Sequence, residues 1–484
     1  MSTSIIHFST ILGRYWNQWI KARGECYNRP MGVFKSYDIR GIYNREWDKD
    51  LAYRIGFFLP ALLETNRILV GRDARESSGE IFESLSRGIR DAGCDVTDIG
   101  LCSTPSVYFA TARFDYGGSV MITASHNPPQ YNGLKISRAR AIPVGYDTGL
   151  NRLEEMVRGV PSPASAPGKL STLDIRQAYL QHLEPYIREV QGIKAVVDCS
   201  DGMASVFIHD VMRNVQGRII TMYDQPDGSF PHHPPNPLIE ANLADVKRRT
   251  LKEKADLGIC FDGDGDRVMF VDETGRFVSP DLIIALLGLH FFRQSGQDHS
   301  GEAVTYDVRT SRSVVEYVEA LGGKPVICKV GHSHAKKLLR DTGGIYGGEL
   351  AGHYYFRDNY FCDSGDIAAL LVLAILSKVK RSFSELVAEI IKYHYSGEIN
   401  FKTDAKDIII QAVLSEYGAQ PGAKLTDIDG IRLDFPDWWF NLRKSNTEPY
   451  LRLVVEASSA EQLVVRTGQL KNRFRELDPQ IEEE

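Results

Sequence analysis

Short apolar runs alternate with amphipathic segments along nearly the whole chain, and this alternation limits the fold more than any other feature. Five of these runs are rich in β-branched or apolar residues and end in glycine or polar residues: 67–73, 118–125, 193–202, 255–267 and 301–308. Strands that alternate with helices indicate βαβ units, whose sheets are covered on both faces. Ligand-binding groups collect where such strands end, because the crevice there is open.

The chain of 484 residues is too long for one ordinary core, so we expect several domains. A proline- and serine-rich linker occupies 159–170, an irregular loop occupies 223–237, and a final α+β unit opens at 396–407, so we place boundaries near 175, 278 and 390. We predict an N-terminal extension of unknown role over 1–30, followed by domains over 31–175, 176–278, 279–390 and 391–484, the last of which is an α+β domain. For the extension, an organellar targeting peptide and a start codon placed too early are the alternatives.

Composition excludes several classes of protein. Hydrophobic residues make up 43% of the chain and charged residues 25%, as in soluble globular proteins. The longest apolar runs, 282–292 and 367–376, are shorter than the roughly 20 residues that span a bilayer, so we interpret them as buried helices. The net charge of −6 gives no general attraction to nucleic acid, and the seven cysteines have no C-x-x-C spacing. We expect a cytoplasmic monomer or weak homodimer that binds small molecules, not nucleic acid or membranes.

The strongest motif is DGDGDR at 262–267, in which Asp262, Asp264 and Asp266 alternate with glycines. Three carboxylates free of crowding can converge on one hard cation, and oxygen ligands favour Mg²⁺, Mn²⁺ or Ca²⁺ over zinc. An EF-hand loop is the wrong interpretation, because its sixth position needs glycine and here is Arg267. A metal-free acidic turn is the remaining alternative.

A serine in the run TASHNP, Ser125, lacks the surroundings of a hydrolase nucleophile. The three aspartates, a divalent cation and Arg267 are together about neutral, so the loop could lie against a further anion. A phosphorylated Ser125 would be such an anion and would donate one oxygen to the metal. Downstream, Asn132-Gly133 predicts a turn that brings Lys135 to the same point. A lysine among cations loses its proton readily, so Lys135 is a candidate general acid or base, with His126 as competitor.

Two further clusters suit a sugar phosphate. In GGELAGHYYF at 347–356, paired glycines allow close approach of a ligand, Glu349 offers a carboxylate to hydroxyls, and His353 offers a donor or acceptor. An ordinary turn before a strand would look similar. The run RKSNTEPYLRL at 443–453 could bind a phosphate through a guanidinium, two hydroxyls, an amide and backbone N–H groups, from Arg443, Ser445, Asn446 and Thr447.

Basic residues beside glycines and strand ends fit one anionic cleft. They are Arg40 in YDIRG, Arg72 in VGRDARESS, Arg309 in DVRTSR and His332 in KVGHSH. Each one alone is more often a surface charge, so only their common placement supports this interpretation.

In these motifs and their order, the sequence resembles the α-D-phosphohexomutase superfamily, closest to its phosphomannomutase/phosphoglucomutase branch. The resemblance implies three related α/β domains with mixed sheets around a central cleft and a C-terminal α+β domain. The resemblance implies that Ser125 is the phosphoserine and, with Asp262, Asp264 and Asp266, holds one Mg²⁺ beside Arg267. It implies catalytic roles for Lys135, His126, Arg40 and His332. It implies substrate binding by Tyr37, Arg309, Glu349, His353, Arg443, Ser445, Asn446 and Thr447.

The resemblance also implies the reaction, a reversible shift of phosphate between C6 and C1 of a hexose. Ser125 would give its phosphate to the free hydroxyl, a hexose 1,6-bisphosphate would turn in the cleft, and the other phosphate would return; that bisphosphate also serves as activator. The sugar loop departs from the family at Ala351, where serine is common. We expect mannose as the sugar, with glucose as the alternative, and a metal-dependent sugar phosphatase or a non-catalytic sensor as less favoured hypotheses.

Overall fold

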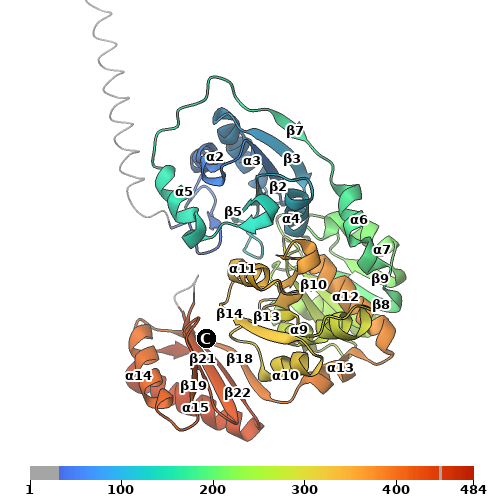
Figure 1. The fold of residues 1–484 in the computed structure, drawn as a ribbon, viewed down its shortest axis with the longest axis vertical. Helices are drawn as coiled ribbons and strands as arrows, with labels where there is room; N and C mark the ends of the chain where they lie inside the picture. The colour runs from blue at the N-terminus through green and yellow to red at the C-terminus, as the bar shows by residue number, and fades with distance from the viewer. Residues whose placement is uncertain (1–31, 446–449, 484) are drawn as a thin grey trace, which may run out of the picture.

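The computed structural model describes residues 32–445 and 450–483, and these form four units that follow one another along the chain (Figure 1). Each unit is built on its own sheet. The first unit, blue to teal, lies at the top of the view, and the last, orange to red, lies at the lower left. The predicted N-terminal extension, 1–30, falls outside the described residues.

The first unit contains a mixed sheet in the order β1-β5-β4-β2-β3-β7, with β6 beside β5. Its strands are β1 (Ile39–Ile42), β2 (Arg67–Arg72), β3 (Asp95–Leu101), β4 (Gly118–Ile122), β5 (Tyr131–Arg138), β6 (Ile142–Pro143) and β7 (Leu170–Thr172). Its helices are α2 (Lys49–Leu63), α3 (Ser78–Asp91), α4 (Thr104–Arg113) and α5 (Leu150–Met156). β4 runs parallel to β2 and antiparallel to β5, so the chain reverses directly after β4.

The second unit has the strand order β12-β11-β10-β8-β9. Its strands are β8 (Gln191–Asp198), β9 (Gln216–Met222), β10 (Leu257–Phe261), β11 (Val268–Asp272) and β12 (Phe277–Val278), and its helices are α6 (Arg176–Ile187), α7 (Ser205–Arg213) and α8 (Ala244–Glu253). Every residue of β10 and β11 is buried, as expected for strands covered on both faces. The two strands form a hairpin, and the hairpin loop carries the aspartates.

The third unit has the strand order β14-β13-β15-β16-β17. Its strands are β13 (Ala303–Asp307), β14 (Lys324–Cys328), β15 (Tyr346–Gly348), β16 (Tyr354–Phe356) and β17 (Cys362–Asp363). Its helices are α9 (Pro280–Leu289), α10 (Arg312–Ala320), α11 (His332–Thr342), α12 (Gly365–Val379) and α13 (Phe383–Ile390). The apolar run 282–292 forms most of α9 and continues into a π-helical turn at His290–Gln294, and the run 367–376 forms most of α12. Both helices are largely buried, which confirms their interpretation as buried helices.

The C-terminal unit is an antiparallel sheet in the order β19-β20-β21-β22-β18-β23. Its strands are β18 (His394–Lys402), β19 (Lys424–Thr426), β20 (Ile431–Asp434), β21 (Trp438–Lys444), β22 (Tyr450–Ala457) and β23 (Glu482–Glu483), and its helices are α14 (Lys406–Gly418) and α15 (Ala460–Leu477). Three α/β units and one α+β unit are the predicted fold class.

The hydrophobic cores differ in extent. One continuous core joins the first three units and includes Met121, Phe261 and Tyr346. The C-terminal unit has a separate core around residues such as Phe440. Among the described residues, the helices are too short or too polar to cross a membrane.

Candidate active site

The predicted metal loop follows β10 directly and turns at Gly265, whose φ is +76°. Asp262, Asp264 and Asp266 are all completely buried, and one oxygen from each lies within 4.8 Å of the others. Three like charges this close repel one another. Burial, together with the charges of Asp264 and Asp266, therefore raises the pKa of Asp262 to about 7.

The donors of this loop fit a hard divalent cation. Asp264 Oδ1 and Asp266 Oδ1 are buried and have no hydrogen-bond partner among the described residues. Buried oxygens are normally satisfied, and a carboxylate in this position is normally paired or bound to a metal. Three carboxylates supply the oxygen ligands that Mg²⁺, Mn²⁺ and Ca²⁺ prefer. The acidic cluster can thus bind a metal ion.

Ser125 lies against this cluster, as the sequence predicted. Its hydroxyl donates a hydrogen bond to Asp262 Oδ2 over 2.8 Å, although the two residues are 137 positions apart. The side chain is almost fully buried, and its φ of +51° is unusual for a residue other than glycine. Such strain is stored preferentially at functional sites and costs about 1–3 kcal/mol.

The approach of the two loops depends on Gly263. A Cβ at this position would lie 2.4 Å from the carbonyl oxygen of Ser125, which is backbone and cannot move aside alone. The glycine between Asp262 and Asp264 is therefore required for the close contact, in addition to leaving room for the carboxylates.

Two predicted catalytic residues, His126 and Arg40, lie at Ser125 or at the loop that carries it. His126 Nδ1 lies 3.3 Å from Ser125 Oγ and accepts a hydrogen bond from Arg267 Nη2. Burial and the charge of Arg267 hold the pKa of His126 well below its usual value, so the ring is neutral. Arg267 Nη2 also lies 3.3 Å from Ser125 Oγ. Arg40 donates to the Asn127 side chain over 2.7 Å and so reaches the same loop.

Lys135 contacts two of the aspartates directly, and its surroundings differ from the prediction. Its Nζ contacts Asp264 Oδ2 at 2.6 Å and also pairs with Asp266 Oδ2. Burial works to lower the pKa of Lys135, but the two carboxylates outweigh burial and raise it. The expectation that neighbouring cations help this lysine to lose its proton is wrong, because its nearest charges are anions.

The sugar loop lies beside the metal loop. Arg267 and His353 form an isolated antiparallel bridge, and Val268 N donates to the carbonyl of Gly352 over 3.2 Å. His353 Nδ1 lies 2.8 Å from Asp363 Oδ2 and 3.7 Å from Asp266 Oδ1. The loops that carry the aspartates and His353 are thus joined by main-chain contacts.

Glu349 is also in the sugar loop, but its carboxylate is partly used within the protein. One oxygen accepts from Gly331 N over 3.0 Å, and the other accepts from the Tyr355 hydroxyl. A carboxylate has about four acceptor positions, so capacity for a further donor remains. Glu349 thereby fixes the start of α11, where the next predicted residue, His332, lies.

His332 faces the interior from the first turn of α11. Its ring centroid lies 5.7 Å from that of His353 and 5.7 Å from that of Tyr37. Burial and the charge of Lys336 hold the pKa of His332 well below its usual value. His332 Nδ1 is buried and has no hydrogen-bond partner within residues 32–445 and 450–483. A neutral imidazole with an unused nitrogen can accept a proton.

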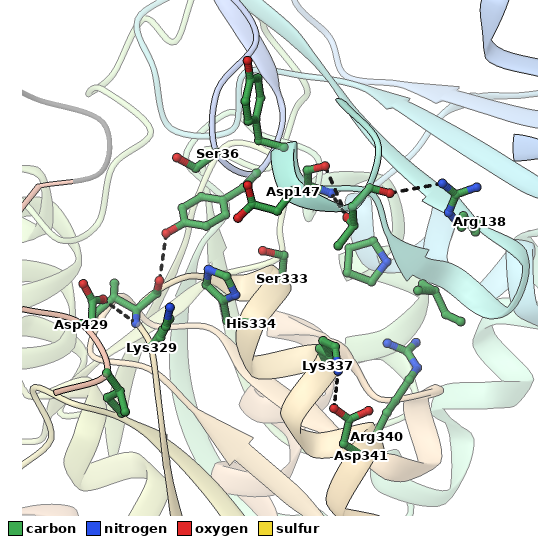
Figure 2. A pocket seen from close by; sticks show the side chains of 18 of the residues that line it. Ser36, Arg138, Asp147, Lys329, Ser333, His334, Lys337, Arg340, Asp341 and Asp429 are labelled. Carbon is green, nitrogen blue, oxygen red and sulfur yellow. Dashed lines mark hydrogen bonds and ion pairs between the residues drawn. The ribbon is translucent and has the colours of Figure 1, made fainter. Parts of the chain in front are cut away.

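A cavity with a volume of about 660 Å³ is lined by residues of the first, third and C-terminal units, Tyr37 among them (Figure 2). The Tyr37 hydroxyl donates to the carbonyl of Val330 over 2.8 Å, and Val330 N donates to Asp429 Oδ2 over 2.9 Å. Ser333 and His334 of α11 lie at the cavity. One short segment before α11 therefore touches two other units at once.

Arg309 and Arg443 lie elsewhere: among the described residues, neither contacts Ser125 or the three aspartates. They meet each other at Glu398, which lies 3.3 Å from Arg309 Nη1 and 2.9 Å from Arg443 Nη2. Ser445, at the end of β21, donates its backbone N–H to the Tyr450 carbonyl over 2.9 Å. The other two residues predicted to bind phosphate here, Asn446 and Thr447, lie outside the described residues.

Comparison with known proteins relates each of the four units to a domain of the same protein family. Four models of phosphoglucomutase/phosphomannomutase domains match in order: α/β/α domains I, II and III, and the C-terminal domain, at residues 31–160, 177–275, 279–393 and 398–465. Phosphohexose mutases from Xanthomonas campestris pv. campestris are 40% identical over 449 residues, which is 92% of this chain and 99% of the relative. The chain belongs to the phosphoglucomutase/phosphomannomutase family.

Other members of this family agree in sequence and in structure. A phosphomannomutase from Escherichia coli K12 is 38% identical and covers 89% of this chain and 95% of its own length. The crystal structure of a phosphoglucomutase/phosphomannomutase family protein from Burkholderia thailandensis has a TM-score of 0.83 at 29% identity, covering 94% of this chain and 99% of that chain.

The sequence did not predict a role for Arg75, the residue that holds the loop carrying Ser125. Arg75 donates to the carbonyls of Ser125, Asn127, Pro128 and Tyr131 at 2.8, 2.7, 2.7 and 3.1 Å. Its side chain is fully buried and paired with Asp73. Arg72, which we expected in the cleft, instead pairs with Asp98 at 2.7 Å. Both arginines stand in VGRDARESS, and no local pattern shows which one turns inward.

Proposed function

We propose that this family member is a phosphomannomutase, an isomerase that interconverts mannose 6-phosphate and mannose 1-phosphate through phosphorylated Ser125 and a hexose 1,6-bisphosphate. The observation that carries the proposal is the contact of the Ser125 hydroxyl with Asp262 at 2.8 Å, at the edge of three converging carboxylates. The names of relatives at 37–38% identity, from Escherichia coli and Vibrio cholerae, support the choice of reaction.

Asp262, Asp264, Asp266 and a phosphate oxygen on Ser125 would hold one Mg²⁺ per chain. A bound divalent cation withdraws charge from the phosphoryl group and makes its phosphorus more electrophilic. Arg267 complements this arrangement, because its guanidinium lies 3.2 Å from Asp262 Oδ2 and 3.3 Å from Ser125 Oγ. Its positive charge can stabilise negative charge on the serine oxygen.

In the transfer step, the bond between Ser125 Oγ and phosphorus breaks as a bond forms from a sugar hydroxyl oxygen to phosphorus. The electron pair of the broken bond stays on Ser125 Oγ, next to Arg267. The sugar hydroxyl loses its proton, and His332 is the proposed acceptor because its buried Nδ1 has no hydrogen-bond partner in the part of the chain that the structure describes. Lys135 is kept protonated by two carboxylates and is the proposed general acid.

The remaining predicted residues would bind the sugar and its second phosphate. Glu349 and His353 project from the sugar loop beside the metal loop, and Tyr37 lies next to His332. Arg309 and Arg443 form a separate basic cluster that would hold the phosphate that is not reacting. A phosphatase would not need this second anion site, since water takes the phosphate.

The test is conversion of mannose 1-phosphate to mannose 6-phosphate by the purified protein with Mg²⁺ and a hexose 1,6-bisphosphate. We expect turnover by the wild type and none by Ser125→Ala, which should also bind Mg²⁺ more weakly in calorimetry than the phosphorylated enzyme does. No turnover with either mannose or glucose phosphates removes the proposal. Release of free phosphate equal to the loss of substrate identifies a phosphatase instead.

Phosphoglucomutase activity is the second candidate, because the family contains both activities and Ala351 departs from the serine that is common in the sugar loop. A coupled assay that compares glucose 1-phosphate with mannose 1-phosphate separates the two. A cytoplasmic location, a monomeric or weakly dimeric state and the domain boundaries given above remain predictions.

A further inference from the structure

Three arginines converge on one carboxylate where the third unit meets the C-terminal unit. Glu398 of β18 accepts from Arg443 of β21 at 2.9 Å and from Arg309 of the third unit at 3.3 Å, and its other oxygen lies 3.0 Å from Arg452 of β22. Burial works to raise the pKa of Glu398, but the charges of Arg309 and Arg443 outweigh it and lower the pKa to about 2. The carboxylate is therefore ionised at neutral pH.

The sheet is shaped to direct Glu398 at these arginines. The pairing of β18 with β22 shifts register between Tyr395 and Glu398, and Gly397 in the shift has a φ of +73°. Ser396 Oγ accepts from Val455 N at 2.9 Å and so satisfies a donor near the irregularity. β-bulges of this kind commonly redirect a side chain beside a functional site.

Two of the arginines differ in how their donors are used. Arg309 forms two bonds to Asp307, at 3.1 and 2.8 Å, and the same Asp307 accepts from Leu350 N of the sugar loop at 2.8 Å. Arg443 is almost fully buried, yet its Nε has no hydrogen-bond partner among the described residues. A buried guanidinium donor without a partner among the described residues is suited to an anionic ligand.

The charges of the cluster fit an exchange of anions. Three guanidiniums, Asp307 and Glu398 together carry an excess of one positive charge. If Glu398 withdraws, the excess is two, which a phosphate monoester of about −1.5 to −2 neutralises. Planar guanidiniums bind carboxylate and phosphate oxygens with similar geometry, so the two anions use the same donors.

We propose that Glu398 is a built-in competitor of the substrate: its carboxylate occupies the phosphate site formed by Arg309, Arg443 and Arg452, and the phosphate of the bound sugar displaces it. The assignment rests on the proposed function, and it adds Arg452 and Glu398 to the site. Inorganic phosphate must displace Glu398 without help, whereas a sugar phosphate also contacts the sugar loop. Glu398 therefore selects for phosphate attached to a sugar and assists its release.

The experiment is calorimetric titration of the full-length protein with inorganic phosphate, which needs no turnover. Glu398→Gln keeps the shape of the side chain and removes the competing charge, so we expect phosphate to bind at least about tenfold more tightly than to the wild type. Arg452→Gln should bind phosphate more weakly. Asp407→Asn is the matched control, because it also removes one carboxylate that pairs with a basic residue of this unit. Its partner is Lys444, which follows Arg443 in the sequence, and the pair is exposed. This variant should leave phosphate affinity unchanged.

Unchanged or weaker phosphate binding by Glu398→Gln overturns the proposal, since Glu398 would then only position the arginines. A gain of equal size in Asp407→Asn also overturns it, because the effect would be general charge. If Glu398→Gln does not fold, Glu398→Asp retains the charge but shortens the reach, and tighter phosphate binding by this variant supports the exchange. If Glu398→Gln binds phosphate more tightly but the wild type has no mutase turnover, the exchange is supported and the proposed reaction is refuted. If the wild type has mutase turnover but Glu398→Gln does not bind phosphate more tightly, the proposed reaction is supported and the exchange is refuted.

Discussion

Replacement of Gly263 by alanine should disable the site without unfolding the chain. Gly263 has no positive φ, so an alanine fits its backbone conformation, but the new Cβ would lie 2.4 Å from Ser125 O and 3.2 Å from Pro235 Cβ. Ordinary contact begins near 3.4 Å, so the metal loop and the serine loop must separate by about 1 Å. A displacement of 1 Å costs roughly 100-fold in rate, and such overpacking costs about 1–3 kcal/mol of stability.

The measurement is kcat/KM for mannose 1-phosphate, together with the free energy of unfolding in urea. Gly468→Ala in α15 is the control, because nothing lies within 4 Å of its new Cβ. This variant should gain about 0.5–1 kcal/mol in stability and keep its activity. Wild-type kcat/KM in Gly263→Ala would refute the claim that the separation of the two loops controls catalysis.

Two other changes test the charges inside the protein. Lys135→Met leaves the Asp264 and Asp266 carboxylates without their cation, so this variant should be less stable than the wild type by about 3–5 kcal/mol in metal-free buffer. In scanning calorimetry, Mg²⁺ should raise the Tm of the variant more than that of the wild type. An equal rise in Tm for both proteins would contradict this. Asp366 of α12 is bonded to the Tyr179 hydroxyl at 2.7 Å, and burial raises its pKa from 3.8 to about 6. Because the folded protein binds the extra proton, its stability should fall as pH rises from about 4 to about 6, by about 3 kcal/mol in total. Asp366→Asn should remove this slope and be more stable at pH 8 by a similar amount in urea unfolding; identical pH profiles would show that the buried charge is compensated.

The sequence was sufficient for the features that local chemistry defines. DGDGDR at 262–267 and the serine of TASHNP each carry a chemical role in their own residues, and strand ends bring such loops together. Buried helices were predicted at 282–292 and 367–376 because those runs are too short for a membrane and too apolar for the surface. Strands that alternate with helices indicated α/β units, whereas the mixed sheets were expected only from the resemblance to the family.

The sequence was insufficient where a role depends on direction or on a distant partner. Arg72 and Arg75 are three residues apart, and only the exit of the chain from β2 decides that Arg75 binds the serine loop. The surroundings of Lys135 were misjudged because its carboxylate neighbours lie more than 120 positions away. Glu398 stands in an ordinary strand sequence, and only the bulge of β18 directs it toward Arg309 of another unit.

The bridge between Arg267 and His353 has a consequence for how such an enzyme changes in evolution. Because main-chain contacts at positions 352 and 353 join the sugar loop to the metal loop, the side chain at position 351 can change while these contacts stay in place. Ala351 is one such exchange. Substrate choice can therefore drift over generations while the phosphoryl-transfer apparatus is inherited intact.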